Sequence, residues 1–179
     1  MKRLVALAFA ISLITGCEQT PRAPSLANEA VFQDSSLGVR FVAPEGWVLY
    51  ARTTPPGGIV TKPIRIVGYQ RPATDGRADL ELYIADYPKS KSLIEYLREH
   101  PIGPEKWLEK SSSDLKIGSI EATNHLLVSV HQSFRQRDVW EIRRKGDRVF
   151  LFICSAMTSD RGVRDQARRA VESVTFQLD

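Results

Sequence analysis

A nearly unbroken run of hydrophobic positions occurs at the start of the chain, whereas later positions mostly alternate between hydrophobic and polar. Residues 4–14 are apolar apart from Ser12, and they follow Lys2 and Arg3. A short positive segment, an apolar run and small residues in this order are typical of a secretory signal peptide. The run is shorter than the roughly 20 residues that a membrane-spanning helix needs, so we expect export rather than a transmembrane anchor.

The end of this run is similar to the lipobox of bacterial lipoproteins, in the order Leu13-Ile14-Thr15-Gly16-Cys17. In such lipoproteins the signal peptide is removed before the cysteine, which then carries the lipid. The resemblance implies that residues 1–16 are a lipoprotein signal peptide and that acyl chains on Cys17, palmitate among them, hold the protein in the lipid bilayer. Glu18 would be the second residue of the mature chain. In such lipoproteins an Asp at this position favours retention in the inner membrane, so the resemblance implies the bacterial outer membrane, facing the periplasm. A chance cysteine behind an ordinary signal peptide is the alternative.

The segment after the cysteine has a different character. Residues 17–30 contain two prolines and no apolar periodicity, which predicts a flexible linker between the lipid anchor and the folded part. The hydrophobic pattern becomes regular from Val31, so residues 31–179 are expected to form a single globular domain. A domain of about 150 residues buries enough surface to be stable without metal ions or disulfides.

Alternation of hydrophobic and polar residues predicts that most of the domain consists of β-strands. A hairpin is expected around the turn at 44–46, between Phe41 and Trp47. Further strands are expected at 64–69, 80–84, 117–123, 125–134, 138–145, 147–157 and 174–178, with Trp107 and residues 111–113 in a loop. The stretch 149–154 is apolar at every position, which predicts a central strand covered on both faces.

Two helices are expected among these strands. A serine followed three residues later by glutamate opens residues 92–100 and forms a capping-box pattern ahead of an apolar stripe. Ser159 or Asp160 can cap a second helix, in which apolar residues recur at helical spacing from Val163 onward. The predicted fold class is therefore α+β, with an antiparallel sheet flanked by helices.

The order of these elements, together with one opening motif, resembles PsbP-like domains. The motif runs from Gly38 through Phe41, Pro44 and Gly46 to Trp47. This family includes the extrinsic protein of the photosynthetic oxygen-evolving complex, its Ran-binding eukaryotic relatives and many bacterial lipoproteins. The resemblance implies an α/β/α sandwich and a binding or assembly role without catalysis. Within the motif, Gly46 is expected to form the turn and Trp47 to lie in the core.

Net charge and cysteine content restrict the partners and the disulfides that the protein can have. The formal net charge of +4 falls to +2 when residues 1–16 are removed, so attraction to polyanions is weak. Export also argues against a nucleic-acid partner, and a monomer is expected. Lipidation of Cys17 leaves Cys154 alone, which excludes an intrachain disulfide. We expect Cys154 to be buried as a small hydrophobic residue.

One cluster of positive charge is a candidate binding surface. It consists of Arg135, Arg137, Arg143, Arg144, Lys145 and Arg148. These residues are expected on or beside one hairpin, with Arg135 and Arg137 on one strand, Arg143 and Lys145 on the next, and Arg144 and Arg148 near the turn. There they could bind an anionic protein or lipid headgroup partner. The alternative is a charged sheet edge that protects the protein against aggregation.

No motif in the sequence predicts catalysis. There is no nucleophile elbow, phosphate-binding loop, dinucleotide fingerprint or zinc-protease motif. His125 and His131, if they share one strand, are about 20 Å apart and cannot bind one metal ion together. No cofactor or metal site is expected. Asp79 and Glu81 lie on the same side of a strand and could form an acid–base pair or help to bind a cation, but a solvated strand face is the simpler interpretation.

The sequence therefore predicts a membrane-anchored lipoprotein with a non-catalytic protein-binding or assembly role in the periplasm. Two alternatives stay open. A small-ligand or lipid carrier needs an apolar pocket of several hundred Å³ between sheet and helix, with a few convergent polar groups. A hydrolase without a recognisable motif needs convergent buried carboxylates.

Overall fold

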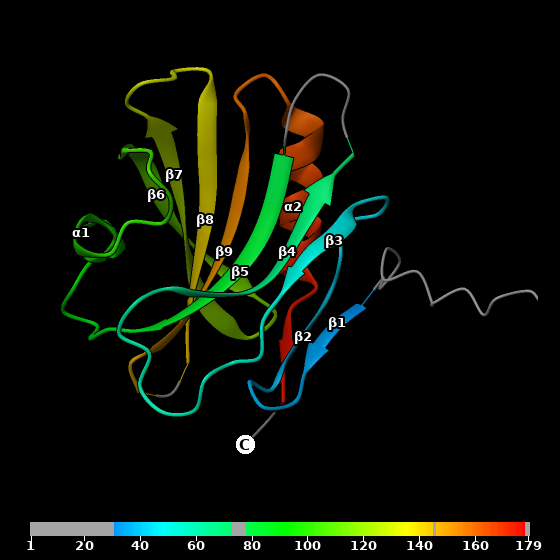
Figure 1. The fold of residues 1–179 in the computed structure, drawn as a ribbon, viewed down its shortest axis with the longest axis vertical. Coiled ribbons are helices and arrows are strands. Elements are labelled where there is room, and N and C mark those ends of the chain that lie inside the picture. The colour runs from blue at the N-terminus through cyan, green and yellow to red at the C-terminus, as the bar shows by residue number, and fades with distance from the viewer. Residues whose placement is uncertain (1–30, 73–77, 145, 178–179) are drawn as a thin grey trace, which may run out of the picture.

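The domain is built from ten strands and two helices within residues 31–72, 78–144 and 146–177, which this computed structural model describes (Figure 1). The elements are β1 (Val31–Asp34), β2 (Val39–Val42), β3 (Val48–Arg52), β4 (Ile64–Arg71), β5 (Ala78–Asp86), α1 (Leu93–Glu99), β6 (Trp107–Ile117), β7 (Ile120–Ser129), β8 (Arg135–Arg143), β9 (Arg148–Met157), α2 (Arg161–Glu172) and β10 (Thr175–Phe176). Seven strands form an antiparallel sheet in the order β3-β4-β5-β9-β8-β7-β6, and the other three form a small sheet in the order β1-β2-β10.

β9 is the middle strand of the large sheet, between β5 and β8. Its side chains alternate between two buried layers, with Phe150 and Phe152 on one face and Leu151 and Ile153 on the other. All four are at most 3% exposed. A strand that is buried on both faces requires apolar residues at every position, so the prediction of a central strand is confirmed.

One face of the large sheet is covered by α2 and the small sheet, and we call it the α2 face. Asp160 caps α2 by accepting a hydrogen bond from the backbone N–H of Val163 at 3.2 Å. Phe41 of β2 packs edge-on against Phe152, with ring centroids 5.2 Å apart. Trp47 belongs to the same core layer and is 5% exposed, so its predicted place in the core is confirmed.

The opposite face, which we call the α1 face, is covered by α1. Ser92 and Glu95 form the predicted capping box, with backbone-to-side-chain hydrogen bonds of 2.9 and 3.3 Å. Tyr96 of α1 stacks on Tyr87, with ring centroids 4.2 Å apart. Helices thus lie on both faces of the sheet, as the α/β/α prediction requires. A helix of seven residues is only about 10 Å long, so α1 covers a small part of its face.

The turn at 44–46 does not form the predicted hairpin. The N–H of Trp47 donates to the carbonyl of Pro44 at 3.1 Å, and Gly46 has a φ of 76°, so the turn itself is present. However, β2 before it pairs with β1 and β10, whereas β3 after it pairs with β4. The chain passes here from the small sheet to the large one. Turn chemistry is local and does not determine which strands pair across it.

The boundaries of β6 and β7 also differ from the prediction. Trp107 and residues 111–113, predicted as a loop, belong to β6. β6 is an edge strand with mostly exposed residues, so its polar sequence lacks the alternation by which a strand is detected. The strand predicted at 117–123 spans the turn at Gly118, which has a φ of 60°. The strand predicted at 125–134 ends at Ser129.

The predicted export and anchoring segments, residues 1–16 and 17–30 with Cys17, lie outside the described residues. As far as the description extends, neither helix is long and apolar enough to cross a membrane. Cys154 is a free thiol with 1% exposure, so its predicted burial is confirmed.

Candidate binding cavity

A cavity of about 460 Å³ lies on the α1 face, beneath α1 and the loop of residues 100–106. Its floor consists of Leu127, Val139 and Ile153, which come from the neighbouring strands β7, β8 and β9. Leu97 of α1 lines it from the opposite side, and most of the lining is apolar. The volume is within the range of roughly 300–1,000 Å³ that is usual for small-molecule sites.

The cavity exists because α1 ends early. Pro101 lacks the N–H and the backbone freedom to continue the helix. Two residues later, Gly103 has a φ of 79°, a left-handed conformation that glycine adopts without strain. The chain therefore turns back into β6 and leaves the three floor residues covered by a loop instead of a helix.

A polar latch formed by Glu105, Ser129 and Arg135 ties this loop to the sheet. Glu105 accepts a hydrogen bond from the Ser129 hydroxyl and lies 3.6 Å from Arg135 Nη1. Beside it, the N–H of Val130 donates to the carbonyl of Lys106 at 3.0 Å. These contacts are made within the chain, so they hold the loop over the cavity without help from a ligand.

Arg137 of β8 reaches into the lining of the cavity. Its guanidinium carbon lies 4.3 Å from the centroid of the Trp107 ring. Nη1 donates to the carbonyl of Ile102 at 2.9 Å, and Nε donates to Ser155 Oγ at 3.1 Å. Burial lowers the pKa of Arg137, whereas the more distant charge of Glu81 acts in the opposite direction. Arg137 is thus fixed in position by neutral groups.

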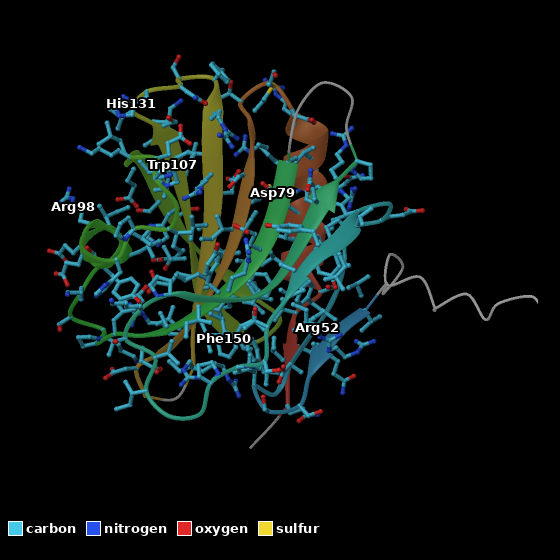
Figure 2. The ribbon with its side chains drawn as sticks, in the orientation of Figure 1. Arg52, Asp79, Arg98, Trp107, His131 and Phe150 are labelled. Carbon is cyan, nitrogen blue, oxygen red and sulfur yellow. The ribbon has the colours of Figure 1, made fainter. Side chains whose placement is uncertain are left out.

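The opening of the cavity is bordered by charged and apolar side chains. Arg98 and Lys106 are exposed there and form no ion pair within the described part of the chain. Leu108 and Val130 are 58% and 47% exposed and add apolar surface to the border of the opening. Figure 2 shows Arg98 on the outer side of α1 and Trp107 nearer to the sheet.

A second group of charged side chains surrounds the buried His125 of β7. Its Nδ1 lies 2.7 Å from Glu109 Oε1, and its Nε2 lies 3.2 Å from Glu141 Oε2. The other oxygen of Glu141 lies 2.5 Å from Arg143 Nη2. Burial alone would lower the pKa of His125, but the hydrogen bonds with Glu141 and Glu109 outweigh it and raise the pKa. Because carboxylates occupy both ring nitrogens, His125 is not placed to activate a hydroxyl or thiol nucleophile.

Glu81 is a buried acid, so the simpler interpretation of a solvated strand face is wrong at this position. Its carboxylate accepts hydrogen bonds from Arg65 at 2.5 Å, from Tyr83 at 3.2 Å and from the hydroxyl of Tyr50. Burial, followed by the negative charge of Glu81, raises the pKa of Tyr83 to about 12. These three donors satisfy the buried carboxylate of Glu81 with hydrogen bonds within the sheet.

The six basic residues predicted as one binding surface are not brought together. Arg135, Arg137 and Arg143 all lie on β8 rather than on two strands. Arg135 and Arg143 stand at opposite ends of this nine-residue strand, roughly 26 Å apart. Lys145 lies outside the described residues.

Most of the described members of this cluster have partners within the protein. Arg143 pairs with Glu141, and Arg148 lies 2.6 Å from Asp86. Arg144 is 4.8 Å above the ring of Phe176. The charges are therefore used in packing and pairing at separate places, and binding of an anionic partner by the whole cluster stays a prediction.

The three histidines lie in separate places. His100 is the C-cap of α1, His125 is buried in the sheet, and His131 is exposed beyond the end of β7. His125 and His131 do not share a strand, because β7 ends at Ser129. In the described ranges, no three histidine, cysteine, aspartate or glutamate side chains are placed to hold a metal ion.

Sequence reasoning placed neither of the two most informative cavity residues correctly. Arg137 was expected on an exposed basic surface, and Trp107 was expected in a loop. A signal was present in the sequence, since Pro101 and Gly103 end α1 before it can cover the apolar positions of the following strands. The volume left uncovered after α1 depends on which strands lie beneath the loop, and the sequence does not show this.

Comparison with known proteins was made at the level of sequence and of structure. No family model and no curated protein matches the sequence. The structure is similar to the solution structure of cyanobacterial PsbP from Synechocystis, with a TM-score of 0.57, 11% identity, and coverage of 88% of this chain and 96% of that one. The fold is PsbP-like. The predicted resemblance is thereby confirmed for the fold, which is all that such an identity shows.

Two other solved structures show similar arrangements. A protein from Bacteroides thetaiotaomicron has a TM-score of 0.51 and 12% identity over 84% of this chain, and the match covers 49% of that protein, about half of its length. LpqN, involved in cell envelope biogenesis of Mycobacterium tuberculosis, has a TM-score of 0.49 and 10% identity, with coverage of 78% of this chain and 83% of LpqN.

Proposed function

We propose that this PsbP-like protein is a non-catalytic carrier, anchored to a bacterial envelope membrane through Cys17, that binds a small apolar ligand in the cavity beneath α1. The cavity itself is the observation that supports this proposal. It has a volume of about 460 Å³ and a mainly apolar lining with a few polar groups. Among the hypotheses that the sequence left open, a carrier is the one that requires such a cavity.

The energetic basis is the transfer of apolar ligand surface from water. Each Å² of apolar surface that is buried contributes about 25 cal/mol. A ligand that enters the cavity covers Leu127, Val139 and Ile153, which already form a floor. The latch holds the loop in place beforehand, so little free energy is needed to order the site before binding.

The non-catalytic part of the proposal rests on how the buried ionisable groups are used. His125 has a carboxylate on each ring nitrogen, and Glu81 accepts hydrogen bonds from three side chains. Neither group lines the cavity. A general base needs a free nitrogen or oxygen within reach of a substrate proton, so these residues are better suited to stabilise the sheet.

Trp107 provides a direct test of binding, because it lines the cavity while Trp47 and Trp140 belong to the core of the α2 face. An uncharged bromoalkyl alcohol quenches indole fluorescence on contact. We expect saturable quenching of the protein and loss of the saturable component in Trp107→Phe. Absence of saturable quenching in the unaltered protein would refute the carrier proposal.

A cavity-filling substitution provides a matched comparison. Leu97→Phe adds volume to the lining and should weaken binding about fivefold or more, because overpacking a filled site costs about 1–3 kcal/mol. Val42→Phe makes a similar change at a position that is 42% exposed on the small sheet, and it should leave binding unchanged.

The anchoring part of the proposal rests on the sequence around Cys17 and has its own test. Cys17→Ala should prevent lipid attachment, so the protein should appear as an unprocessed or mislocalised precursor in fractionated cells. Mass spectrometry of the purified protein should give an N-terminus that begins at an acylated Cys17. An unmodified mature chain that begins elsewhere would contradict the anchor without affecting the cavity.

A further inference from the structure

Arg137 differs from the other partly buried arginines on the strands of the large sheet. Each of the others lies within ion-pair distance of a carboxylate, as shown by Arg65 with Glu81, Arg71 with Asp160, Arg135 with Glu105, Arg143 with Glu141 and Arg148 with Asp86. Arg137 has no such partner within the described residues, where its hydrogen bonds go to a hydroxyl and a carbonyl. A partly buried charge without a counter-charge is costly, and proteins normally pair it.

The guanidinium of Arg137 is fixed in position, yet not all of its N–H groups donate hydrogen bonds to the protein. Nε and Nη1 are used by Ser155 and Ile102, and the Trp107 ring lies beneath the plane. Nη2 has no hydrogen-bond acceptor among the described residues. It lies close to Gly103, since a Cβ atom built on this glycine would be 3.7 Å from Nη2. A fixed guanidinium with free N–H groups is the arrangement that recognises carboxylate and phosphate oxygens.

From this position we infer that the ligand is an anionic amphiphile, whose carboxylate or phosphate group pairs with Arg137 while its apolar chain fills the cavity. This inference rests on the function proposed above. The apolar floor of Leu127, Val139 and Ile153 accounts for the chain, and Arg137 accounts for the head group. Because burial already lowers the pKa of Arg137, an incoming anion would relieve the cost of its charge.

Other charges at the cavity do not offer the same site. Arg98 and Lys106 are exposed at the opening, where water and salt screen their attraction for an anion. Glu105 is the one acid in the lining, and its carboxylate is engaged by Ser129 and Arg135 in the latch. A cationic head group would therefore have to break the latch in order to pair with Glu105.

The test compares ligands that share a chain length and differ in the head group. Decanoate, decyl phosphate, decanol and decylamine are titrated by calorimetry into residues 18–179, which contain every described element. We expect at least one of the two anions to bind about tenfold or more tightly than decanol, because charge-assisted hydrogen bonds are roughly twice as strong as neutral ones. Whichever anion binds more tightly identifies the class of head group. Decylamine should bind most weakly.

Substitutions locate the effect at one residue. Arg137→Gln should bring the affinity for the preferred anion to within about threefold of that for decanol and leave decanol within about twofold of its original value. Arg98→Gln and Lys106→Gln serve as matched controls at the opening, and each should change anion binding less than about threefold, as expected of screened charges. Arg137→Lys keeps the charge but loses the planar fork, and it should retain part of the preference.

The outcomes separate this inference from the function on which it rests. Equal affinity of anions and decanol, or tighter binding of decylamine, would overturn the inference and leave the carrier function standing. Failure of all four ligands to bind would overturn both. If Arg137→Gln does not fold, the ranking of the four ligands on the unaltered protein still decides. A larger loss in Lys106→Gln than in Arg137→Gln would also refute the role of Arg137.

Discussion

On the α2 face of the large sheet, a twelve-residue helix and a second sheet press aromatic rings such as Phe41 and Phe152 together. On the α1 face, a seven-residue helix and a loop cover the same strands and leave a cavity of about 460 Å³. Both faces belong to one sheet, and β9 supplies apolar side chains to each. The two sides differ because one is covered by longer elements.

This difference separates the larger core from the cavity that we propose as the binding site. The α2 face contains the larger core, so it supplies most of the apolar burial that holds the fold together. The α1 face contains the cavity, the unpaired Arg137 and the His125 cluster, which would be costly in a closely packed core.

Truncation of a large side chain should affect the two faces very differently. Trp47→Ala on the α2 face should lower the free energy of unfolding by about 3–5 kcal/mol, because a buried aromatic residue is lost. Leu97→Ala on the α1 face should cost only about 1 kcal/mol, because that side chain is partly exposed and already borders a cavity. Urea denaturation measures both values, and equal losses would contradict the comparison.

Enlarging a side chain should change the free energy of unfolding in opposite directions on the two faces. Ala167→Leu places a larger side chain between α2 and the sheet, where Ala167 is fully buried, and should cost about 1–3 kcal/mol. Val139→Ile adds one methylene group beside the cavity and should raise the free energy of unfolding by about 0.5–1 kcal/mol. Thermal and denaturant unfolding report the sign. Destabilisation by both substitutions would indicate that the α1 face is as tightly packed as the other.

The dependence of stability on pH should arise on the α1 face. The pKa of His125 is raised in the folded state, so its contribution is present below the unfolded value of about 6.5 and is lost as pH rises through the folded value. Burial alone would raise the pKa of Glu141, but His125 and Arg143 outweigh it and lower this pKa. The contribution of Glu141 to stability is therefore lost only as the solution becomes strongly acidic. The free energy of unfolding should therefore fall from about pH 6 toward alkaline pH.

Two histidine variants sharpen this expectation. His125→Gln should remove the fall in stability above about pH 6, since no imidazolium remains between the two carboxylates. His131→Gln, at an exposed histidine, should leave the pH profile of the unaltered protein intact. Identical profiles for both variants would show that the buried cluster does not control the pH dependence.

The smallest effect is expected where an arginine is exposed on the outer side of α2. Arg168 lies 3.5 Å from Asp165 and 3.9 Å from Glu172, and the side chain is 58% exposed. Arg168→Ala should change the free energy of unfolding by less than about 0.5 kcal/mol, because exposed ion pairs contribute little. A loss comparable to that of Leu97→Ala, measured in the same urea series, would indicate that α2 depends on its surface charges.

Several features of the fold follow from the sequence alone, because their causes are local. The apolar run at 149–154 identified β9 as the central strand, and the capping box at Ser92 identified the start of α1. Spacing of apolar residues identified the buried side of α2, and the opening motif placed Trp47 in the core. Each of these four features depends on residues that are close in the chain, or only on whether a residue is buried and not on its contact partners.

Only the tertiary structure decided the pairing of distant segments and the chemistry that results. The turn at 44–46 is correctly indicated by its residues, yet it connects two sheets, because strand pairing depends on partners elsewhere in the chain. Arg137 looks from the sequence like one more surface charge. It lines a cavity without an ion-pair partner among the described residues, because the short α1 and the turn at Gly103 leave β8 covered by a loop whose acid, Glu105, is engaged by Ser129 and Arg135 instead.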